Sequence, residues 1–524
     1  MVKLNFLCAW LLIFILPGAF APAQHNNNLV RSIPEAEGVS SSRILNFVEA
    51  IANSGQEWHS FMLLRHGKVV AEGWWDPYGP QLRHSMYSVS KSFTSTAIGF
   101  AVSEKKLSLS DKVISFFPGD LPDTVSPYLA QLTVKDLLIM STGHDPEPTG
   151  EAIRSSRSWV ASFLKIPLAY EPGTKFLYNT LATYMLSAVI QKVTGEKLMD
   201  YLKPRLFSPL GINEIDWEVS PQGINTGGYG LRLKTEDMAR FGQLYLQNGK
   251  WNGKQLLSPK WINEATTTKI DPVPIWVTPG TTKDSSDWRQ GYGYQFWRCR
   301  NNAYRADGLA GQFIIIMPDH DAVLAITAEV YETQKELNLV WKYLLPAFHK
   351  EPLPADEKSN SLLKRKIASL AVPLSPNANY AANTKKISGR VFELEPNDKR
   401  LKKIYFRFRG DSCLVSLTTD SSMFPLVFGN GKWLEGKTMK TGPYMVATLV
   451  GLLPFKVAGS FSWQNANTLE LVLRYIETPH TERMICRFGE NGISVEVISS
   501  KSNSKKTELR GRMLAAEQAG SNHP

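Results

Sequence analysis

The sequence of 524 residues contains few cysteines. There are four, Cys8, Cys299, Cys413 and Cys486, and their wide spacing matches neither a disulfide framework nor a metal site. The spacing gives no support to a single bridge between Cys413 and Cys486. The chain also lacks Gly-x-Ser-x-Gly, His-Glu-x-x-His, Cys-x-x-Cys and a P-loop. We therefore expect no metal and no cofactor.

After its first residues, the chain has no apolar run of the roughly 20 residues that a membrane span requires. The first run, Phe6 to Leu16, is shorter, follows Lys3 and precedes the small residues of "AFAPAQ". This order is typical of a secretory signal. We expect residues 1–23 to be removed and the mature protein to be periplasmic or secreted, with no indication of membrane association. An uncleaved anchor is the alternative.

Positive charge is in excess, with a formal net charge of +11, but it is spread along the chain. The densest basic run is "DKRLKKIYFRFRG", residues 398–410, in which apolar residues recur at partly strand-like spacing. A solvated strand face explains this run, and a site for a polyanion or a membrane surface is the alternative. We expect no nucleic-acid partner, and the sequence leaves the oligomeric state open.

The composition and the hydrophobic patterning of the sequence change along the chain and predict two domains. Residues 24–350 mix helical and strand patterns, and residues 351–385 are rich in Pro, Asn, Lys and Ser, which is typical of a linker. Residues 386–500 alternate as in a barrel-like or sandwich-like all-β domain, and the polar tail, 501–524, is expected to be disordered. The expected inward positions of the β domain are Phe461, Trp463, Leu469, Leu471 and Leu473.

The stretch "RHSMYSVSKSFTSTAIGFAV", residues 83–102, predicts a helix with a buried face. Ser88 and Lys91 are three residues apart, so their side chains can meet. A serine becomes a nucleophile when a base lies beside it, and lysine can be that base if burial or a neighbouring charge lowers its pKa. The alternative is a capping serine followed by a surface lysine, since the same spacing recurs, for example at Ser103 and Lys106.

Further motifs follow in order: "LTVKDLLIMSTGHD", "PGTKFLYNTLATYML", "GGYGLRLKTEDMARFGQLYLQNGKWNGKQLLSP" and "RADGLAGQFIIIMPD". Together with "YSVSKSFTSTAIG", they make residues 35–350 resemble a family of serine hydrolases. This family includes class C β-lactamases, penicillin-binding D-Ala-D-Ala carboxypeptidases, esterases and 6-aminohexanoate-oligomer hydrolases. The resemblance implies an α/β domain in which helices flank an antiparallel sheet.

The resemblance implies that Ser88 is the nucleophile and that Lys91 and Tyr178 handle its proton. We expect the Lys91 ammonium to depress the pKa of the Tyr178 phenol, so that a phenolate takes the Ser88 proton. The family's Tyr-x-Asn motif is changed here, because Thr180 stands in place of the asparagine. Thr180 is then a substrate-binding candidate.

The family's third motif is a basic residue, a small hydroxyl residue and a glycine on a strand. The matching residues are Ala306, Asp307 and Gly308, so the basic group that would hold a substrate carboxylate is absent. Gly308 would let the substrate approach the backbone closely. The Leu309 N–H would complete an oxyanion hole with the Ser88 N–H. A register ending at Gly311 or Gln312 is the alternative.

The sequence thus predicts an exported serine hydrolase that acts on a small-molecule ester or amide through an acyl-enzyme. Alternatives are acyl transfer to an alcohol or amine, a β-lactamase or D-Ala-D-Ala carboxypeptidase, and a non-catalytic penicillin-binding-type sensor. The sensor would bind through β-domain aromatics such as Trp433, Tyr444 and Trp463. We expect the β domain to cover or shape the Ser88 pocket, or to hold a partner, without joining the chemistry. The nearby histidines are interpreted as structural: His66, His84 and His144.

Overall fold

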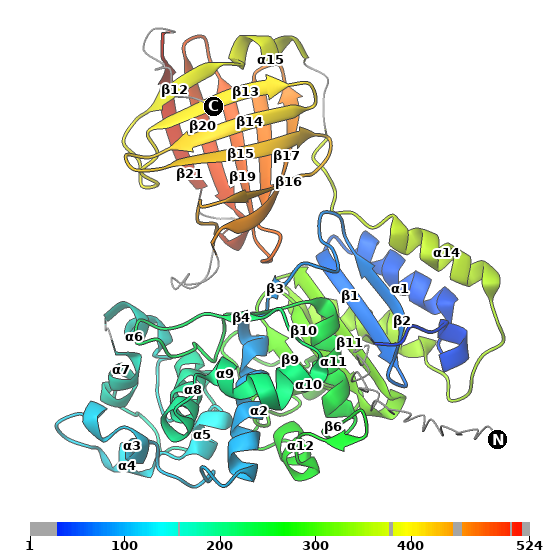
Figure 1. Cartoon of the computed structure of the whole chain (residues 1–524), viewed down its shortest axis with the longest axis vertical. Helices are drawn as coiled ribbons and strands as arrows, with labels where there is room; N and C mark the ends of the chain where they lie inside the picture. Colours follow the sequence, from blue (N-terminus) through cyan, green and yellow to red (C-terminus); the bar gives the residue numbers. More distant parts are fainter. Residues whose placement is uncertain (1–28, 156–157, 377–380, 444–452, 503–505, 516–524) are drawn as a thin grey trace, which may run out of the picture.

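The computed structural model describes residues 29–155, 158–376, 381–443, 453–502 and 506–515. The predicted signal segment and Tyr444 lie outside this part of the chain. An N-terminal α/β domain and a C-terminal barrel are joined by a segment that runs along the sheet side of the first domain (Figure 1). None of the described helices is long and apolar enough to cross a membrane.

The α/β domain is built on an antiparallel sheet with strand order β2-β1-β11-β10-β9-β8. Two hairpins, at His66–Gly67 and at Pro318–Asp321, join neighbouring strands. The strands are β1 (Glu57–Arg65), β2 (Lys68–Trp74), β8 (Trp297–Arg298), β9 (Tyr304–Gly308), β10 (Gln312–Met317) and β11 (Ala322–Glu329).

Both faces of this sheet are buried. Phe61 and Leu63 of β1 pack with Phe47 of α1 (Ser41–Asn53), whereas Met62 and Leu64 join the core on the opposite face. Because successive side chains of a strand point to opposite faces, burial of both gives continuous apolar runs such as "FMLL" and "FIII". On the α1 side the chain adds α13 (Thr333–Leu339), a π-helical turn (Val340–Leu344) and α14 (Glu357–Ala368).

The opposite face of the sheet carries most of the helices. Among them, α2 (Ser90–Ser103) packs against α8 (Thr180–Thr194), and α11 (Thr235–Leu246) covers β1, β10 and β11. Phe93 of α2 stacks on Phe241 of α11 with ring centroids 3.9 Å apart. The other helices are α3 (Val113–Phe116), α4 (Pro127–Gln131), α5 (Val134–Leu138), α6 (Thr149–Ser155), α7 (Trp159–Lys165), α9 (Leu198–Leu202), α10 (Ser208–Leu210) and α12 (Pro259–Thr266).

Two small sheets complete this domain. The strands β3 (His84–Ser85), β5 (Leu231–Leu233) and β4 (Asp216–Trp217) pair in that order, and β3 leads directly into the segment that precedes α2. The second is the hairpin of β6 (Lys250–Trp251) and β7 (Lys254–Gln255). The first of these sheets fixes the backbone just before Ser88.

The C-terminal domain is a closed barrel, one of the two all-β forms that the sequence predicts. Nine strands form the ring in the order β15-β14-β13-β12-β21-β20-β19-β18-β17, and parallel pairing of β15 with β17 closes it. The tenth strand, β16, pairs with β17 outside the ring. The strands are β12 (Arg390–Leu394), β13 (Lys403–Arg409), β14 (Ser412–Thr418), β15 (Met423–Asn430), β16 (Leu434–Thr438), β17 (Phe455–Asn465), β18 (Thr468–Arg474), β19 (Thr481–Phe488), β20 (Gly492–Ser499) and β21 (Lys506–Met513).

Side chains fill the inside of the barrel. All five positions expected to point inward belong to its core: Phe461, Trp463, Leu469, Leu471 and Leu473. Cys413 and Cys486 lie in the same core, and both are free thiols, so they form no bridge. The short helix α15 (Ala381–Ile387) precedes the first barrel strand. Trp463 is inside the barrel and therefore offers no surface for a ligand.

Two sequence expectations about the ends of the domains are wrong in part. The expected linker contains α14, whose Leu363 packs into the core beside α1. The expected disordered tail contains β21, which pairs with both β12 and β20. Both segments are polar because each buries only one side of a helix or strand, so their composition resembles that of a linker or tail.

Candidate active site

Ser88 lies in a tight turn between β3 and α2. The turn is a short 3-10 segment, Tyr87–Val89, and Tyr87 has a left-handed backbone with φ of 45°. This conformation is uncommon for a residue with a side chain, and it turns the chain sharply before α2 begins at Ser90. Ser88 is half-buried and lines a cavity, so its hydroxyl is accessible to a small molecule.

Lys91 points inward at Ser88 and is only 1% exposed. Its Nζ lies 3.0 Å from Ser88 Oγ, 3.2 Å from Thr180 Oγ1 and 2.8 Å from the Gly228 carbonyl oxygen. Burial lowers the pKa of Lys91 to about 7, against the opposing effect of the charges of Glu147 and Asp307. A surface lysine, the alternative left open by the sequence, is therefore wrong.

Tyr178 comes from the loop before α8 and covers the same two side chains. The Lys91 Nζ lies 4.9 Å from the centroid of the Tyr178 ring, and the Tyr178 side chain interacts with Ser88. Burial and the charge of Asp307 raise the pKa of Tyr178, although the interaction with Ser88 opposes them. The expected depression of this pKa is thus wrong, because burial penalises the phenolate more than the neighbouring groups stabilise it.

Thr180 takes the place that the family gives to an asparagine amide. Its hydroxyl accepts a hydrogen bond from Lys91, and its backbone N–H donates to Glu147 Oε1 at 3.2 Å. The preceding Asn179 is buried and caps α8 by accepting from the Ala182 N–H at 3.1 Å. Thr180 therefore contacts Lys91 directly, whereas its expected contact with substrate stays a prediction.

The third motif passes very close to the backbone before Ser88. A Cβ added to Gly308 would lie 2.4 Å from the Met86 carbonyl oxygen, so a larger residue cannot occupy this position without displacement. Gly308, Leu309 and Ala310 all line the Ser88 cavity. Gly311 instead packs against Glu336, which favours the register that ends at Leu309.

The buried Gln312 side chain holds the turn that contains Leu309. Its Nε2 donates to the carbonyl oxygens of Leu309, Ala310 and Ala328 at 3.1, 3.0 and 2.8 Å. These bonds tie the carbonyls of the turn to a buried side chain. The role of the Leu309 N–H in an oxyanion hole stays a prediction.

The cavity beside Ser88 has a volume of about 360 Å³ and largely aromatic walls. Its aromatic residues are Tyr178, Trp276, Trp288, Trp297 and Tyr331. No lysine, arginine or histidine is among the described residues that line it. Asp307 also lines the cavity, and Arg305 Nε donates to its Oδ2 at 2.8 Å. The cavity therefore offers apolar contact and no exposed cation for a substrate carboxylate.

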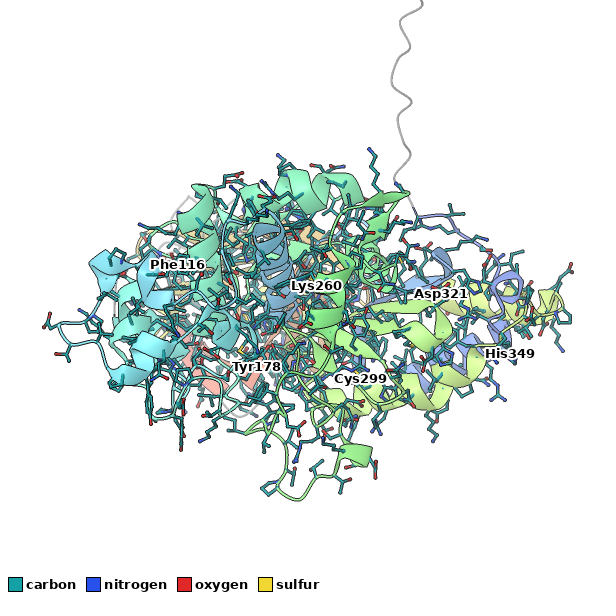
Figure 2. The ribbon with its side chains drawn as sticks, turned by 90° about the horizontal axis from the view of Figure 1, so that it is seen from below. Phe116, Tyr178, Lys260, Cys299, Asp321 and His349 are labelled. Atoms are coloured by element: carbon teal, nitrogen blue, oxygen red, sulfur yellow. The ribbon has the colours of Figure 1, made fainter. Side chains whose placement is uncertain are left out.

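The site lies where the helices meet the sheet. Viewed from below, Tyr178 sits between the helical side, marked by Phe116, and the sheet side, marked by Asp321 (Figure 2). None of the described residues that line the cavity belongs to the barrel. His66, His84 and His144 are also absent from the cavity lining, and His84 and His144 are buried among other hydrogen-bonding groups.

Sequence reasoning missed several groups that surround Lys91 and Ser88. Gly228 and Glu147 surround the lysine, and the tryptophans form the cavity walls. The quoted motif "GGYG" contained a usable signal for Gly228, because a Cβ there would lie 2.8 Å from the Thr180 side chain. The tryptophans come from segments without a motif.

Comparison with known proteins identifies the family of the α/β domain. A family model described as Beta-lactamase matches residues 52–345, which is more than half of the chain. The protein therefore belongs to the beta-lactamase family, and it is a hydrolase of that family. The matched region ends before the barrel.

Two curated relatives are named as a hydrolase and an amidase. The 6-aminohexanoate-dimer hydrolase of Paenarthrobacter ureafaciens is 24% identical over 291 residues, covering 51% of this chain and 71% of that protein. The N-acetylmuramyl-L-alanine amidase of Bacillus subtilis (strain 168) is 29% identical over 302 residues, covering 46% and 67%. A solved Bacillus anthracis structure, provisionally named a 6-aminohexanoate-dimer hydrolase, aligns with a TM-score of 0.50 at 20% identity, covering 63% and 89%, and shares the fold.

Proposed function

We propose that the protein is an exported serine hydrolase that forms a covalent acyl-enzyme at Ser88 with a small ester or amide. The observation that carries the proposal is the buried Lys91 amine, 3.0 Å from the Ser88 hydroxyl. A lysine whose pKa is lowered to about 7 is neutral in a large fraction of molecules at neutral pH. It can then act as the general base for the serine.

In the acylation step, the neutral Lys91 amine takes the Ser88 proton while Oγ bonds to the acyl carbon. Tyr178 keeps its proton at rest, since its pKa is raised. It can donate that proton to the leaving group as the acyl bond breaks, and the Lys91 ammonium replaces it. Water then attacks the acyl carbon and gives a proton to Lys91, the bond between Ser88 Oγ and the acyl carbon breaks, and the Lys91 ammonium returns the proton to Oγ as the acid is released. The N–H groups of Ser88 and Leu309 would stabilise the oxyanion in both steps.

The cavity supports a substrate without a carboxylate next to the scissile bond. Its walls are aromatic, and Ala306 occupies the position of the family's basic residue. We therefore propose that uncharged esters and amides are turned over in preference to β-lactams or D-Ala-D-Ala peptides. Rates with nitrocefin and with p-nitrophenyl esters, measured side by side, test this preference, and efficient cephalosporin hydrolysis would contradict it.

A fluorophosphonate probe tests the nucleophile. We expect mass spectrometry to find one adduct on the peptide that contains Ser88, and the Ser88→Ala variant to lose it. A second serine, Ser103, precedes Lys106 at the same spacing but is far along α2, so Ser103→Ala is the matched control and should label normally. Unchanged labelling of Ser88→Ala would refute the proposal.

Acyl transfer to an alcohol or amine would use the same acyl-enzyme. Product analysis with an ester substrate and an added alcohol separates the two outcomes, because a transferase forms the new ester while a hydrolase releases the acid. We place hydrolysis first because the chain belongs to a family of hydrolases.

A further inference from the structure

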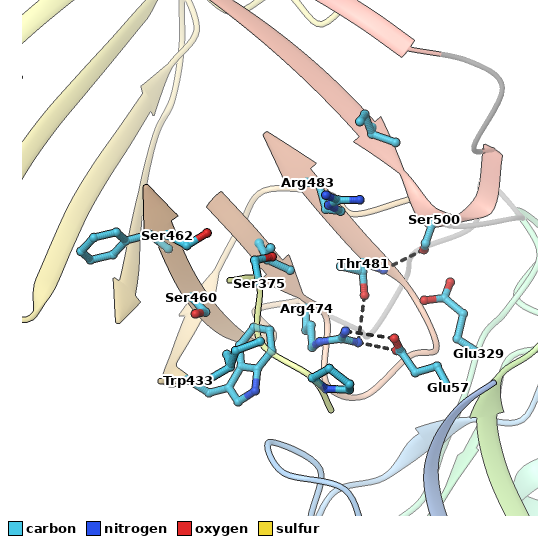
Figure 3. Close-up of a pocket in the computed structure, with 15 residues that line it drawn as sticks. Glu57, Glu329, Ser375, Trp433, Ser460, Ser462, Arg474, Thr481, Arg483 and Ser500 are labelled. Carbon is cyan, nitrogen blue, oxygen red and sulfur yellow. Dashed lines mark hydrogen bonds and ion pairs between the residues drawn. The ribbon is translucent and has the colours of Figure 1, made fainter. Parts of the chain in front are cut away.

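The barrel reaches the α/β domain through the hairpin between β18 and β19, residues 475–480. Its tip is held by its own hydrogen bonds, including Tyr475 N–H to the His480 carbonyl at 3.0 Å. Beside the tip, Arg474 forms an ion pair with Glu57 at the start of β1, and Thr481 and Glu329 lie next to this pair (Figure 3). The hairpin is therefore anchored to the N-terminal end of β1 in the central sheet.

The same hairpin contacts the chain on both sides of Met86. The Ser85 N–H donates to the Glu477 carbonyl at 2.9 Å. The Tyr87 hydroxyl forms a hydrogen bond with Nε2 of His480, and His480 is fully buried. Ser88 follows Tyr87 directly, so a barrel residue bonds to the side chain immediately before the nucleophile.

Tyr87 is the residue with the left-handed backbone in the turn before Ser88. A side chain disfavours this conformation, so the surroundings have to maintain it. The ring of Tyr87 is buried, and its centroid lies 5.8 Å from that of His480 in an edge-on arrangement. The hydrogen bond to His480 adds a polar contact that fixes this ring, and with it the backbone of the turn.

His480 also connects to the other wall of the site. Its Nδ1 lies 3.4 Å from Oε1 of Glu329, the last residue of β11. The carboxylate is an electrostatic neighbour of Nδ1 and not its hydrogen-bond partner. A proton on Nδ1 would face this carboxylate and leave Nε2 to accept from the Tyr87 hydroxyl. The next residue, Val330, donates its N–H to the Ala310 carbonyl at 3.0 Å, in the turn that contains Leu309.

We propose that His480 of the barrel is a positioning residue for acyl transfer, which links the Ser88 turn through Tyr87 to the Leu309 turn through Glu329. The inference rests on the proposed function of Ser88. The two turns would together supply the N–H groups of the oxyanion hole, and their relative placement decides how well an oxyanion is held. The barrel thereby affects the reaction through the turns that contain Ser88 and Leu309, and none of its described residues lines the substrate cavity.

The isosteric variant Tyr87→Phe tests the link in the full-length protein. It removes the hydroxyl and keeps the ring. We expect kcat for p-nitrophenyl acetate and the rate of fluorophosphonate labelling at Ser88 to fall at least 10-fold, with KM within about twofold of wild type. A change in kcat alone indicates a loss that appears in the transition state, whereas general loosening of the fold would lower the melting temperature as well.

Variants of His480 test whether the loss of rate in Tyr87→Phe comes from the lost contact with the barrel. His480→Ala should reproduce the loss seen in Tyr87→Phe, and the double variant should be no slower than either single variant, because both break one link. His480→Gln should regain part of the rate, since its side-chain amide can reach the Tyr87 hydroxyl. Lys456→Gln is the matched control: it removes the ion pair of a partly exposed lysine with Glu477 of the same hairpin and should leave kcat unchanged.

Rates within twofold of wild type in Tyr87→Phe, or additive losses in the double variant, would overturn the proposal. These outcomes differ from a failure of the proposed function. If Ser88 were not the nucleophile, the wild-type protein itself would carry no Ser88 adduct. If only the positioning inference failed, wild type and Tyr87→Phe would both be labelled at Ser88 at the same rate.

Discussion

The Lys91 amine and the Ser88 hydroxyl face each other inside the protein, with 3.0 Å between Nζ and Oγ. Burial lowers the pKa of this lysine from 10.5 to about 7, whereas burial and Asp307 raise the pKa of the adjacent Tyr178 phenol. At neutral pH, Lys91 is therefore in large part a neutral amine, whereas Tyr178 is a protonated phenol. The amine is the available base, and the phenol is the available acid.

The pH dependence of activity distinguishes these roles. We expect kcat/KM for p-nitrophenyl acetate to rise with pH, with a midpoint near 7, and to level off above it, because the neutral amine is the active form. A phenolate base at Tyr178 would instead place the rise in the alkaline range, since its pKa is raised. A rate still climbing steeply between pH 8 and pH 10 would contradict the assignment of Lys91 as base.

The same lysine makes the stability of the fold depend on pH. Its pKa is lower in the folded than in the unfolded protein, so the unfolded state binds more protons between pH 7 and 10.5. The free energy of unfolding should therefore gain up to about 5 kcal/mol from this group as the pH rises through that window. The destabilisation of the folded state by the buried Lys91 is complete below about pH 7 and absent above about pH 10.5.

The variant Lys91→Met lacks this titrating group, so the stability of the wild-type protein is compared directly with that of the variant. Chemical denaturation at pH 6, 7, 8 and 9.5 should show the stability of wild type rising relative to the variant above pH 7, and a constant difference below it. The comparison cancels the pH effects of other groups. A difference between the two proteins that does not change with pH would show that Lys91 keeps its ordinary pKa.

Tyr178→Phe should affect poor leaving groups more than good ones. An amide nitrogen has to be protonated as it leaves, whereas p-nitrophenolate leaves without a proton. We expect a loss of roughly 100- to 10,000-fold in kcat for an anilide and a clearly smaller loss for p-nitrophenyl acetate. Equal losses for both substrates would mean that Tyr178 acts before the leaving group departs, as a base for Ser88 would.

The central side chains of the site could be predicted from the sequence because short motifs contain them. Ser88 and Lys91 lie on one helical turn, and the resemblance to a known family placed Tyr178 beside them. The protonation states could not be predicted, because they depend on burial by distant segments. Lys91 is enclosed by Thr180 and the Gly228 carbonyl, which are 89 and 137 residues away in the sequence.

The fold of the barrel could also be predicted from the sequence only in part. Alternating runs predicted the strands whose inner face is rich in leucine and aromatic residues, such as β17 and β18. β21 was missed because only Leu509 of its eight residues is buried, so its sequence carries no alternation of apolar residues. The contact of His480 with Tyr87 joins residues 393 apart, and no local pattern indicates such a pair.

Gly308→Ala should damage the site while leaving the rest of the fold in place. The added methyl group would lie 2.4 Å from the Met86 carbonyl oxygen, so either Leu309 or the Ser88 turn has to move. A displacement of about 1 Å can cost roughly 100-fold in rate, and we expect a loss of that order in kcat. Gly119→Ala is the control, because a methyl group there meets nothing within 4 Å. Activity retained in Gly308→Ala would mean that this close approach has no catalytic role.

Trp276 forms part of the cavity wall although 51% of its surface is exposed, and it packs edge-on against Tyr178 with 5.5 Å between ring centroids. Trp276→Ala should therefore lower kcat/KM about 10-fold for p-nitrophenyl phenylacetate, whose ring can pack against the indole, and less than threefold for p-nitrophenyl acetate. The neighbouring Ile275 is 86% exposed and does not line the cavity, so Ile275→Ala should change neither rate. If Trp276→Ala slowed both esters equally, the residue would support Tyr178 and would not select the acyl group.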